Sequence, residues 1–548
     1  AIDPIELPGA LARYPDLYIA DEFHIFGVHQ EAAILNSLLL IRYSRLKKRP
    51  LRVLFTSATP KTEFVNQLQQ AGFKVAMVEG SYTSESANGF RPILQPTTLE
   101  FVSLKPEADA IITWLKEQGD TILDIFATDA RGRGRGLIIL NSVAMVSRVV
   151  RELQALFPET QVKVREISGR IDRQERLKTQ AELKDAPESV LIIATSAVDV
   201  GVDFRIHLLV FEASDSATFI QRLGRLGRHP DFDGYKAFAL IPGRTPWIVA
   251  RLKEKLTDGQ TISRVKSSED ELDFREIVEF AFDPPREFEQ YRAYWGALQA
   301  QGMLLTMSRY KDRAKVMQPI QESMMADLRR VYGEQLDKKR GHWFALNDDK
   351  KGVGKAVQQE LLRFRGGSNL QAAVWDDIRF YTYDLLRLLP HIELEIIDRH
   401  TFLNAAKPYH HSETEFDDRY IQVYLRVQRW LDRREPIELK CDRGSDELRE
   451  CTLSLIDRLS ITGHPQSAVS RCLQGKKLLA FLVSVNHKPQ DSHWQISRTL
   501  HLNPNFGLYR LTDLDDQPYA CAFGQDALLL EALKWRLKPC EKAKPYIF

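Results

Sequence analysis

Several features that define other protein classes are missing from this sequence of 548 residues. Its five cysteines, Cys441, Cys451, Cys472, Cys521 and Cys540, include no C-x-x-C pair, so a zinc module or dense disulfide framework is not indicated and we expect reduced thiols. No apolar run approaches the ~18 residues of a membrane-spanning helix. The first residues also lack the pattern of a signal peptide. We therefore expect a cytoplasmic protein with no membrane partner.

An excess of charge of either sign is also missing. The sequence has 76 Lys and Arg against 74 Asp and Glu, a net charge of +2. Because the total is so small, any surface for nucleic acid has to be a local patch. The strongest local excess that we find lies in residues 309–365, with 14 basic and 8 acidic side chains. This stretch either lines a nucleic-acid path or forms the solvated surface of a helical region.

Short apolar runs alternate with helical patterns in the first half of the chain. Bounded by polar segments, such runs indicate buried strands of a parallel sheet. Strands are expected at 16–20, 51–56, 73–78, 137–141, 162–167, 190–195 and 208–212, and helices at 61–71, 142–156, 172–184 and 216–223. The pattern predicts two α/β units. Between them, the alternating Arg and Gly of residues 131–136 predict a solvated loop.

The pattern changes after about residue 260. Helical periodicity dominates there, with one late β-like stretch at 478–485. Helices are expected at 286–301, 317–332, 374–389, 416–431 and 525–537. The C-terminal region is therefore predicted to be mainly helical.

Two polar segments follow expected strands of the first unit. Asp21 and Glu22 come directly after the strand at 16–20, and Ser57-Ala58-Thr59 follows the strand at 51–56. Carboxyl ends of parallel strands form the crevice where α/β folds bind ligands. There one carboxylate can hold Mg²⁺ with the phosphates of a nucleotide, and its neighbour can activate water. Two solvated acids and an ordinary turn are the alternative interpretation.

The most specific signal is the segment from Gln221 to Arg228 (QRLGRLGR). Arg222, Arg225 and Arg228 recur at every third residue with glycines between them. Guanidinium groups pair bidentately with phosphate oxygens. Each glycine costs a helix about 1 kcal/mol relative to alanine, so a purely structural helix has little reason to contain two. The segment therefore favours phosphate binding over a solvated basic helix end.

With the stretch from Thr195 to Asp203 (TSAVDVGVD), these segments resemble motifs II, III, V and VI of superfamily 2 helicases. The resemblance covers residues 16–245 and implies an α/β fold with two RecA-like parallel-sheet domains, the first N-terminally incomplete, followed by the mainly helical region. The expected domains are 1–120, 121–260 and 261–548, the last a linker with accessory domains.

The resemblance also implies the cofactors and the site. ATP and Mg²⁺ are expected, with Glu22, Arg225 and Arg228 as catalytic residues and Asp21 as the metal ligand. Residues expected to contact the nucleotide are Asp21, Glu22, Gly201, Asp203, Gln221, Arg225 and Arg228. Residues expected to contact nucleic acid or to couple to it are Ser57, Thr59, Ser168, Arg170 and Thr195.

One departure from the family is the phosphate loop, G-x-x-x-x-G-K-[ST], which the sequence does not contain. Gly352 to Lys355 (GVGK) match only part of this pattern and follow the second unit, so we reject them. Because the other motifs have little use without this loop, we expect an N-terminal segment outside the printed sequence to carry it.

The residues within these motifs most resemble those of the CRISPR-associated helicase of type I interference systems. No His-Asp dipeptide occurs, so the HD nuclease of most members is not indicated, and the arrangement is similar to type I-D. The resemblance implies an ATP-dependent single-stranded DNA translocase or helicase, with a guide-RNA surveillance complex and a separate HD nuclease subunit as partners. Two alternatives stay open: an RNA helicase of the D-E-x-H type, and a clamp that binds nucleic acid without hydrolysing ATP.

Overall fold

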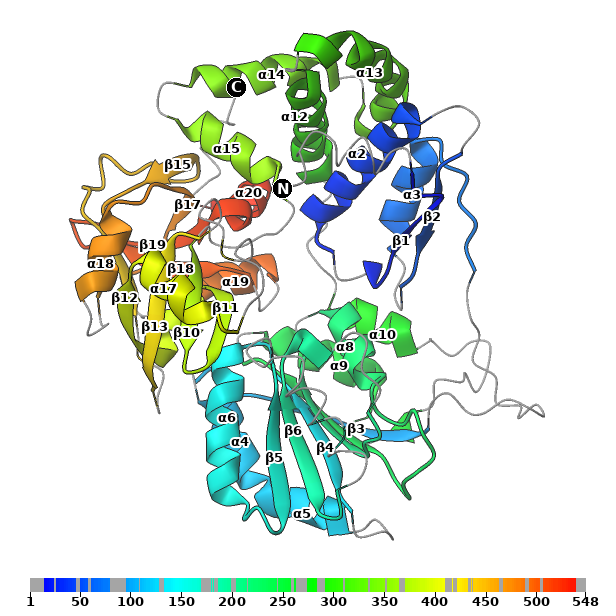
Figure 1. Ribbon diagram of the computed structural model, residues 1–548, viewed down its shortest axis with the longest axis vertical. Helices are drawn as coiled ribbons and strands as arrows, with labels where there is room; N and C mark the ends of the chain where they lie inside the picture. The colour runs from blue at the N-terminus through cyan, green and yellow to red at the C-terminus, as the bar shows by residue number, and fades with distance from the viewer. Residues whose placement is uncertain are drawn as a thin grey trace.

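Figure 1 shows the computed structural model of the protein. It describes residues 14–23, 26–45, 50–57, 61–78, 95–107, 109–127, 133–168, 179, 181, 186–198, 204–213, 215–243, 245–257, 261–262, 274–282, 291–308, 311–333, 336–349, 352–363, 370–409, 416, 421–431, 435, 437–462, 467–487, 492–502 and 506–538. The expected helix at 172–184 lies mostly outside these residues.

The first unit is a small layer of strands covered by helices. Strands β1 (Leu17–Ala20) and β2 (Arg52–Phe55) pair in parallel, in register from Leu17 with Arg52 to Ala20 with Phe55. Helices α2 (Val28–Ser44) and α3 (Thr62–Gln70) follow them. The strand expected at 73–78 is wrong, since this segment has no strand pairing. Its last apolar residues, Met77 and Val78, are 51% and 95% exposed instead of buried in a sheet.

The second unit holds a seven-stranded sheet of order β5-β6-β4-β7-β8-β3-β9. All its pairings are parallel except that of β9 with β3. The elements are β3 (Thr97–Ser103), α4 (Ala110–Glu117), α5 (Gly119–Ala127), β4 (Arg135–Ile139), α6 (Val143–Leu156), β5 (Val162–Ile167), β6 (Ser189–Ala194), η2 (Ser196–Val198), β7 (Leu208–Glu212), α8 (Ser216–Leu223), β8 (Lys236–Ile241), α9 (Pro246–Lys255) and β9 (Thr261–Ile262). Apolar clusters cover both faces, so the central strands are buried.

Two expectations about this unit need correction. Strand β3 lies within the expected domain 1–120, yet it pairs with β8 of the second sheet, because its alternating buried residues such as Leu99 and Phe101 complete that core. Arg135 is 5% exposed instead of solvated. Its guanidinium donates to the carbonyl oxygens of Gly134 (2.9 Å) and Glu188 (2.8 Å), which satisfies the charge inside the fold.

A helical region follows the second unit. It contains the π-helix η3 (Arg292–Gly296), α12 (Ala297–Ser308), α13 (Lys311–Tyr332), α14 (Leu336–Asp348) and α15 (Val353–Leu361). Helix α10 (Phe274–Ala281) comes before these helices and packs into the core of the second unit. Helices α12 and α13 share one apolar cluster with α2 and α3 of the first unit. Figure 1 shows α2 lying beside α12 and α13, although the chain passes through the whole second unit between them.

Beyond this region the chain is mixed, which corrects the prediction of a mainly helical C-terminal region. One four-stranded and one six-stranded sheet, of orders β11-β10-β13-β12 and β15-β17-β19-β18-β14-β16, share an apolar core. The elements are β10 (Gln371–Asp376), β11 (Arg379–Asp384), α16 (Leu385–Leu388), η4 (Leu389–His391), β12 (Ile392–Ile397), α17 (Arg399–Ala406), β13 (Val423–Trp430), β14 (Glu438–Cys441), β15 (Leu453–Ile456), β16 (Leu459–Thr462), α18 (Ser467–Gln474), β17 (Leu478–Ser484), α19 (His493–Leu500), β18 (Leu508–Thr512), β19 (Pro518–Phe523), α20 (Gly524–Ala532) and η6 (Lys534–Arg536).

The wrong helix predictions have a local cause. Strands β10 and β11 form a hairpin whose tight turn contains Asp377 at a φ of 56°, a left-handed conformation that Asp tolerates. Strand β13 alternates buried and outward side chains from Val423 onward, which is the period of a strand. The β-like stretch at 478–485 is confirmed as β17.

The cysteines are not all reduced. Cys451 is disulfide-bonded, whereas Cys441, Cys472 and Cys521 are free. Pairing between cysteines distant in sequence has no spacing signature, which is why the sequence did not indicate it. Among the described residues, no helix combines the length and apolarity that crossing a lipid bilayer requires.

Candidate nucleotide and nucleic-acid site

The acidic and hydroxyl segments of the first unit meet at the carboxyl ends of β1 and β2. The Thr56 hydroxyl donates a hydrogen bond to Asp21 Oδ1, which also accepts from the Glu22 amide at 3.0 Å. The Phe23 amide donates to the Thr56 carbonyl at 2.9 Å. Glu22 adopts a φ of 51°, so the chain turns sharply at the acids. Sequence reasoning predicted this proximity but missed Thr56, which the β1–β2 register sets beside the acids.

One face of this small sheet is left open. Leu17, Ile19 and Leu54 are 48%, 62% and 46% exposed, and they alternate with half-buried neighbours along both strands. A parallel sheet normally has both faces covered, and a pair of strands is not stable by itself. The first unit therefore presents an apolar surface directly beside Asp21 and Glu22.

In the second unit, polar side chains gather at the carboxyl edge of the sheet. Ser168 follows β5 and Thr195 follows β6, and the last residues of these strands are paired in register. The Thr195 amide donates to the Ile167 carbonyl at 3.1 Å, and the Ser168 hydroxyl donates to Glu166. Both residues are buried, at 0% for Ser168 and 6% for Thr195. The structure thus brings these two predicted residues to the same edge.

Helix α8 is fixed to that edge by Arg222, one of the three arginines from which the sequence predicted phosphate binding. Arg222 is 1% exposed and donates to Asn141 Oδ1 at 2.8 Å and to the Glu212 carbonyl at 2.6 Å. The Asn141 amide donates to Glu212 Oε2 at 2.6 Å, and Asp215 caps the helix by accepting from the Thr218 amide at 2.7 Å. Arg222 therefore positions the arginine segment relative to β4 and β7. Its partners come from other strands, so no local pattern indicates this role.

The remaining residues of the arginine segment differ in exposure. Gln221 and Arg225 are buried, at 7% and 4%, while Arg228 is half-buried with its Nε donating to the Gly224 carbonyl at 2.7 Å. Gly227 has a φ of 71°, and a Cβ there would lie 3.1 Å from the backbone of Gln95, so this turn requires glycine. In Figure 1, α8 lies at the end of the second unit that is nearer to the first.

Several predicted residues lie outside the described part of the chain. These are Thr59, Arg170, Gly201 and Asp203. Ser57 is described and half-buried, one residue beyond Thr56. For Gly352 to Lys355, Gly354 has a packing role, because a Cβ there would lie 2.1 Å from the Leu346 carbonyl oxygen of α14.

The basic stretch at 309–365 is partly neutralised within the fold. Arg330 pairs with Asp327, Arg329 with Asp337 at 2.6 Å, and Arg363 with Glu360 at 3.5 Å. Lys339 is 6% exposed and lies 3.6 Å from the centre of the Tyr294 ring, and burial lowers the pKa of its ammonium group. Trp343 of this stretch and Trp295 of η3 are core residues.

Residues 132–231 match the family model described as CRISPR-associated nuclease/helicase Cas3, C-terminal. The match lies within the second unit and includes Thr195 and the whole arginine segment. No curated protein matches the chain.

Several solved structures show a partial similarity to this chain. The crystal structure of T. fusca Cas3 has a TM-score of 0.37 and 15% identity, covering 67% of this chain and 43% of that one. DUF1998 helicase MrfA bound to DNA has a TM-score of 0.47 and 12% identity, covering 96% and 72%. Mycobacterium smegmatis helicase Lhr bound to ssDNA and AMP-PNP has a TM-score of 0.34 and 13% identity, covering 67% and 42%. The chain thus spans less than half the length of that Cas3. The sheet topology of the protein itself confirms the predicted α/β class with parallel sheets.

Proposed function

We propose that the protein is an ATP-dependent translocase or helicase that moves on single-stranded DNA in CRISPR interference, in the cytoplasm. The observation that carries the proposal is the arginine segment from Gln221 to Arg228. It is anchored by Arg222 to the carboxyl edge of a parallel sheet, in a unit that matches the Cas3 C-terminal model. The proposed partners are a guide-RNA surveillance complex and a separate HD nuclease subunit.

The first unit supplies the chemistry that phosphoryl transfer to water requires. The carboxylates of Asp21 and Glu22 are the hard oxygen ligands that Mg²⁺ prefers, and Asp21 is exposed at its strand end, so the residues fit the ion. In this proposal Asp21 holds Mg²⁺, which would neutralise charge on the phosphates, and Glu22 orients and deprotonates the attacking water. The hydrogen bond from Thr56 fixes the Asp21 carboxylate.

The second unit supplies the cations. Gln221, Arg225 and Arg228 are proposed to contact the nucleotide across from Asp21 and Glu22, with Gly201 and Asp203 nearby. Because Arg225 is 4% exposed, the proposal requires that nucleotide binding draw its guanidinium out of the protein interior. Exchange of protein contacts for phosphate contacts would then tie nucleotide binding to a movement of α8.

The nucleotide site also needs a phosphate loop. We propose that the segment which supplies this loop packs on the exposed face formed by Leu17, Ile19 and Leu54. This face lies beside the acids, so strands added there would end next to Asp21 and Glu22.

Nucleic acid is proposed to lie along the carboxyl edges of both sheets. Ser57, Ser168 and Thr195 provide hydroxyl groups at these edges, and Thr59 and Arg170 are proposed to join them. Binding through backbone phosphates predicts an affinity that falls steeply with salt.

The experiment is strand displacement by the full-length protein with ATP, on DNA and on RNA duplexes that carry a single-stranded overhang. We expect the wild-type protein to displace a DNA strand, and we expect the Arg225→Ala variant to lose this activity. The control is Arg205→Ala, which removes an exposed ion pair with Asp231 (3.3 Å) in the same unit. Displacement of RNA alone would favour the RNA helicase. Tight binding without displacement or ATP hydrolysis would favour the clamp.

A further inference from the structure

Helix α2 begins a few residues after Asp21, and helix α3 begins a few residues after Ser57. Helix α2 is joined to the helical region by polar contacts near both of its ends, and the same side chains of α2 also bond to the two ends of α3. We call these contacts the first clamp (Glu31, Lys61 and Arg292) and the second clamp (Arg42, Tyr43, Asp327 and Arg330).

The first clamp lies at the start of both helices. Glu31 of α2 is 1% exposed, and its Oε1 accepts from Lys61 Nζ at 2.6 Å, while its Oε2 accepts from Arg292 of η3. Lys61 is the N-cap residue of α3 and also donates to the Phe26 carbonyl. One carboxylate thus joins the turn after Glu22, the turn after Ser57 and the helical region. Removal of one partner would leave a buried charge uncompensated.

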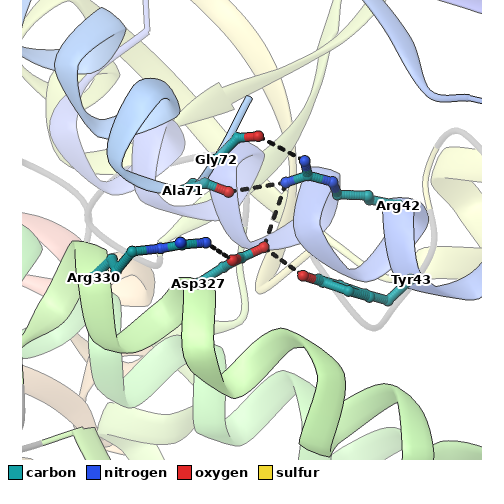
Figure 2. Close-up of polar contacts among 6 residues, drawn as sticks. All are labelled: Arg42, Tyr43, Ala71, Gly72, Asp327 and Arg330. Atoms are coloured by element: carbon teal, nitrogen blue, oxygen red, sulfur yellow. Dashed lines mark hydrogen bonds and ion pairs between the residues drawn. The ribbon is translucent and has the colours of Figure 1, made fainter. Parts of the chain in front are cut away.

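The second clamp lies at the other end of both helices (Figure 2). Asp327 of α13 is 4% exposed and accepts from Tyr43 at 2.5 Å, from Arg42 at 3.4 Å and from Arg330. Arg42 also donates to the carbonyl oxygens of Ala71 (2.9 Å) and Gly72 (2.7 Å), where α3 ends. Burial, with the adjacent Asp327 carboxylate, raises the pKa of the Tyr43 hydroxyl.

Between the clamps the contact is a continuous core. Asn36 of α2 is fully buried, donating to the Gly296 carbonyl at 3.1 Å and to Gln299 at 3.2 Å and accepting from Tyr332 at 2.8 Å. Apolar side chains of α2, α3, α12 and α13 pack around it. The first unit and α12–α13 therefore form one body, although most of their polar contacts join residues more than 250 positions apart.

We propose that Glu31 and Asp327 are positioning residues that make the helical region an extension of the first motor unit. This rests on the proposed function: a nucleotide-driven shift of the segments containing Asp21 and Ser57 is passed through the first clamp to η3 and through the second clamp to α13, so that ATP hydrolysis is converted into strand movement. Without the clamps, hydrolysis proceeds and the movement is lost. Neither residue touches the nucleotide.

The test compares two rates in the full-length protein: DNA-stimulated ATP hydrolysis and displacement of a DNA strand. In Glu31→Gln and Asp327→Asn, we expect hydrolysis to stay within about twofold and displacement to fall at least about fivefold, the lower range of measured couplings. Tyr43→Phe removes one hydroxyl and keeps the ring. We therefore expect displacement to fall relative to hydrolysis in this variant too, but by a smaller factor. The matched control is Glu322→Gln, the same kind of change at an exposed residue of α13 whose carboxylate accepts from Gln318 at 3.1 Å, and it leaves both rates unchanged.

A parallel fall of both rates, or no fall, would overturn the proposal. A second measurement separates it from the proposed function, because hydrogen exchange needs no catalysis. Asp327→Asn should speed amide exchange in α2, and Glu31→Gln should speed it in α13, by about tenfold. Faster exchange confined to the substituted helix would show that the two helices do not form one body, whether or not the protein hydrolyses ATP.

Discussion

The two α/β units close their cores in different ways. In the second unit, β4 and β6 are buried on both faces by apolar residues from residues 97–282. In the first unit, β1 and β2 are covered on one face, and part of that cover comes from α12 and α13 of the helical region. The core of the second unit is therefore formed by its own stretch of sequence. The core of the first unit also includes residues more than two hundred positions away.

In the proposed nucleotide site, this difference gives the two units separate roles. The second unit presents its arginine segment from a buried edge, where Arg222 bonds to Asn141 just after β4 and to Glu212 at the end of β7. The first unit presents Asp21 and Glu22 from a sheet whose position depends on α2, α3 and the two clamps. Stability of the first unit is thus tied to the region it is proposed to move.

The sharpest contrast concerns isoleucines on the two sheets. Ile138 of β4 is 0% exposed and Ile19 of β1 is 62% exposed. We expect Ile138→Ala to lower the local unfolding free energy by about 4 kcal/mol, because it leaves a cavity in a packed core. In the 548-residue chain, where this face is exposed, Ile19→Ala should change it by less than about 0.5 kcal/mol. Hydrogen exchange of the β4 and β1 amides measures both values, and equal losses would contradict the contrast.

The C-terminal region adds a third case to this comparison. There Asp526 of α20 is buried, and nearby positive charge does not fully compensate its carboxylate. Burial raises the pKa of Asp526 to about 6 despite Arg387 nearby. The fold thus favours the protonated carboxyl, and stability is lost as pH rises from the unfolded pKa toward 6. Asp526→Asn should therefore stabilise the protein above pH 6 by on the order of 2 kcal/mol, with no gain below pH 4.

Thermal unfolding at pH 4 and pH 8 checks this prediction. In the wild type, the Gly507 amide donates a hydrogen bond to Asp526 Oδ2 at 3.0 Å. The Asn side chain keeps an oxygen that can accept this bond. A gain of the same size at both pH values would mean that ionisation of Asp526 is not the cause.

The smallest expected effect concerns the turn after α8. Gly227→Ala places a Cβ 3.1 Å from the Gln95 backbone at a φ of 71°. We expect a loss of about 1–2 kcal/mol in the second unit, and Gly234→Ala, with open space around its Cβ, serves as the control. Urea unfolding monitored by tryptophan fluorescence measures both. A loss no larger than that of the control would show that the turn tolerates a side chain.

The sequence predicted the second unit better than the rest for a physical reason. Strand β7 and helix α8 match their predicted bounds because a buried apolar run and an Asp cap are local signals. In the predicted helix at 374–389, the leucine-rich end does form the short helix α16 (Leu385–Leu388). The turn at Asp377 and the pairing of β10 with β13 make the residues before it strands. The proximity of Asp21 to the segment after β2 followed from strand order. The contacts of Arg222 and Asp327 join distant segments, so no local pattern indicates them.

The central claim is that Glu22 and Arg228, from different units, act on one nucleotide. The most direct measurement is ATP hydrolysis by the full-length protein, with and without single-stranded DNA, in the wild type, Glu22→Gln and Arg228→Ala. We predict stimulation by DNA in the wild type and a loss of at least about 100-fold in each variant, as removal of a general base or an arginine finger produces. Hydrolysis at the wild-type rate in either variant would contradict the claim.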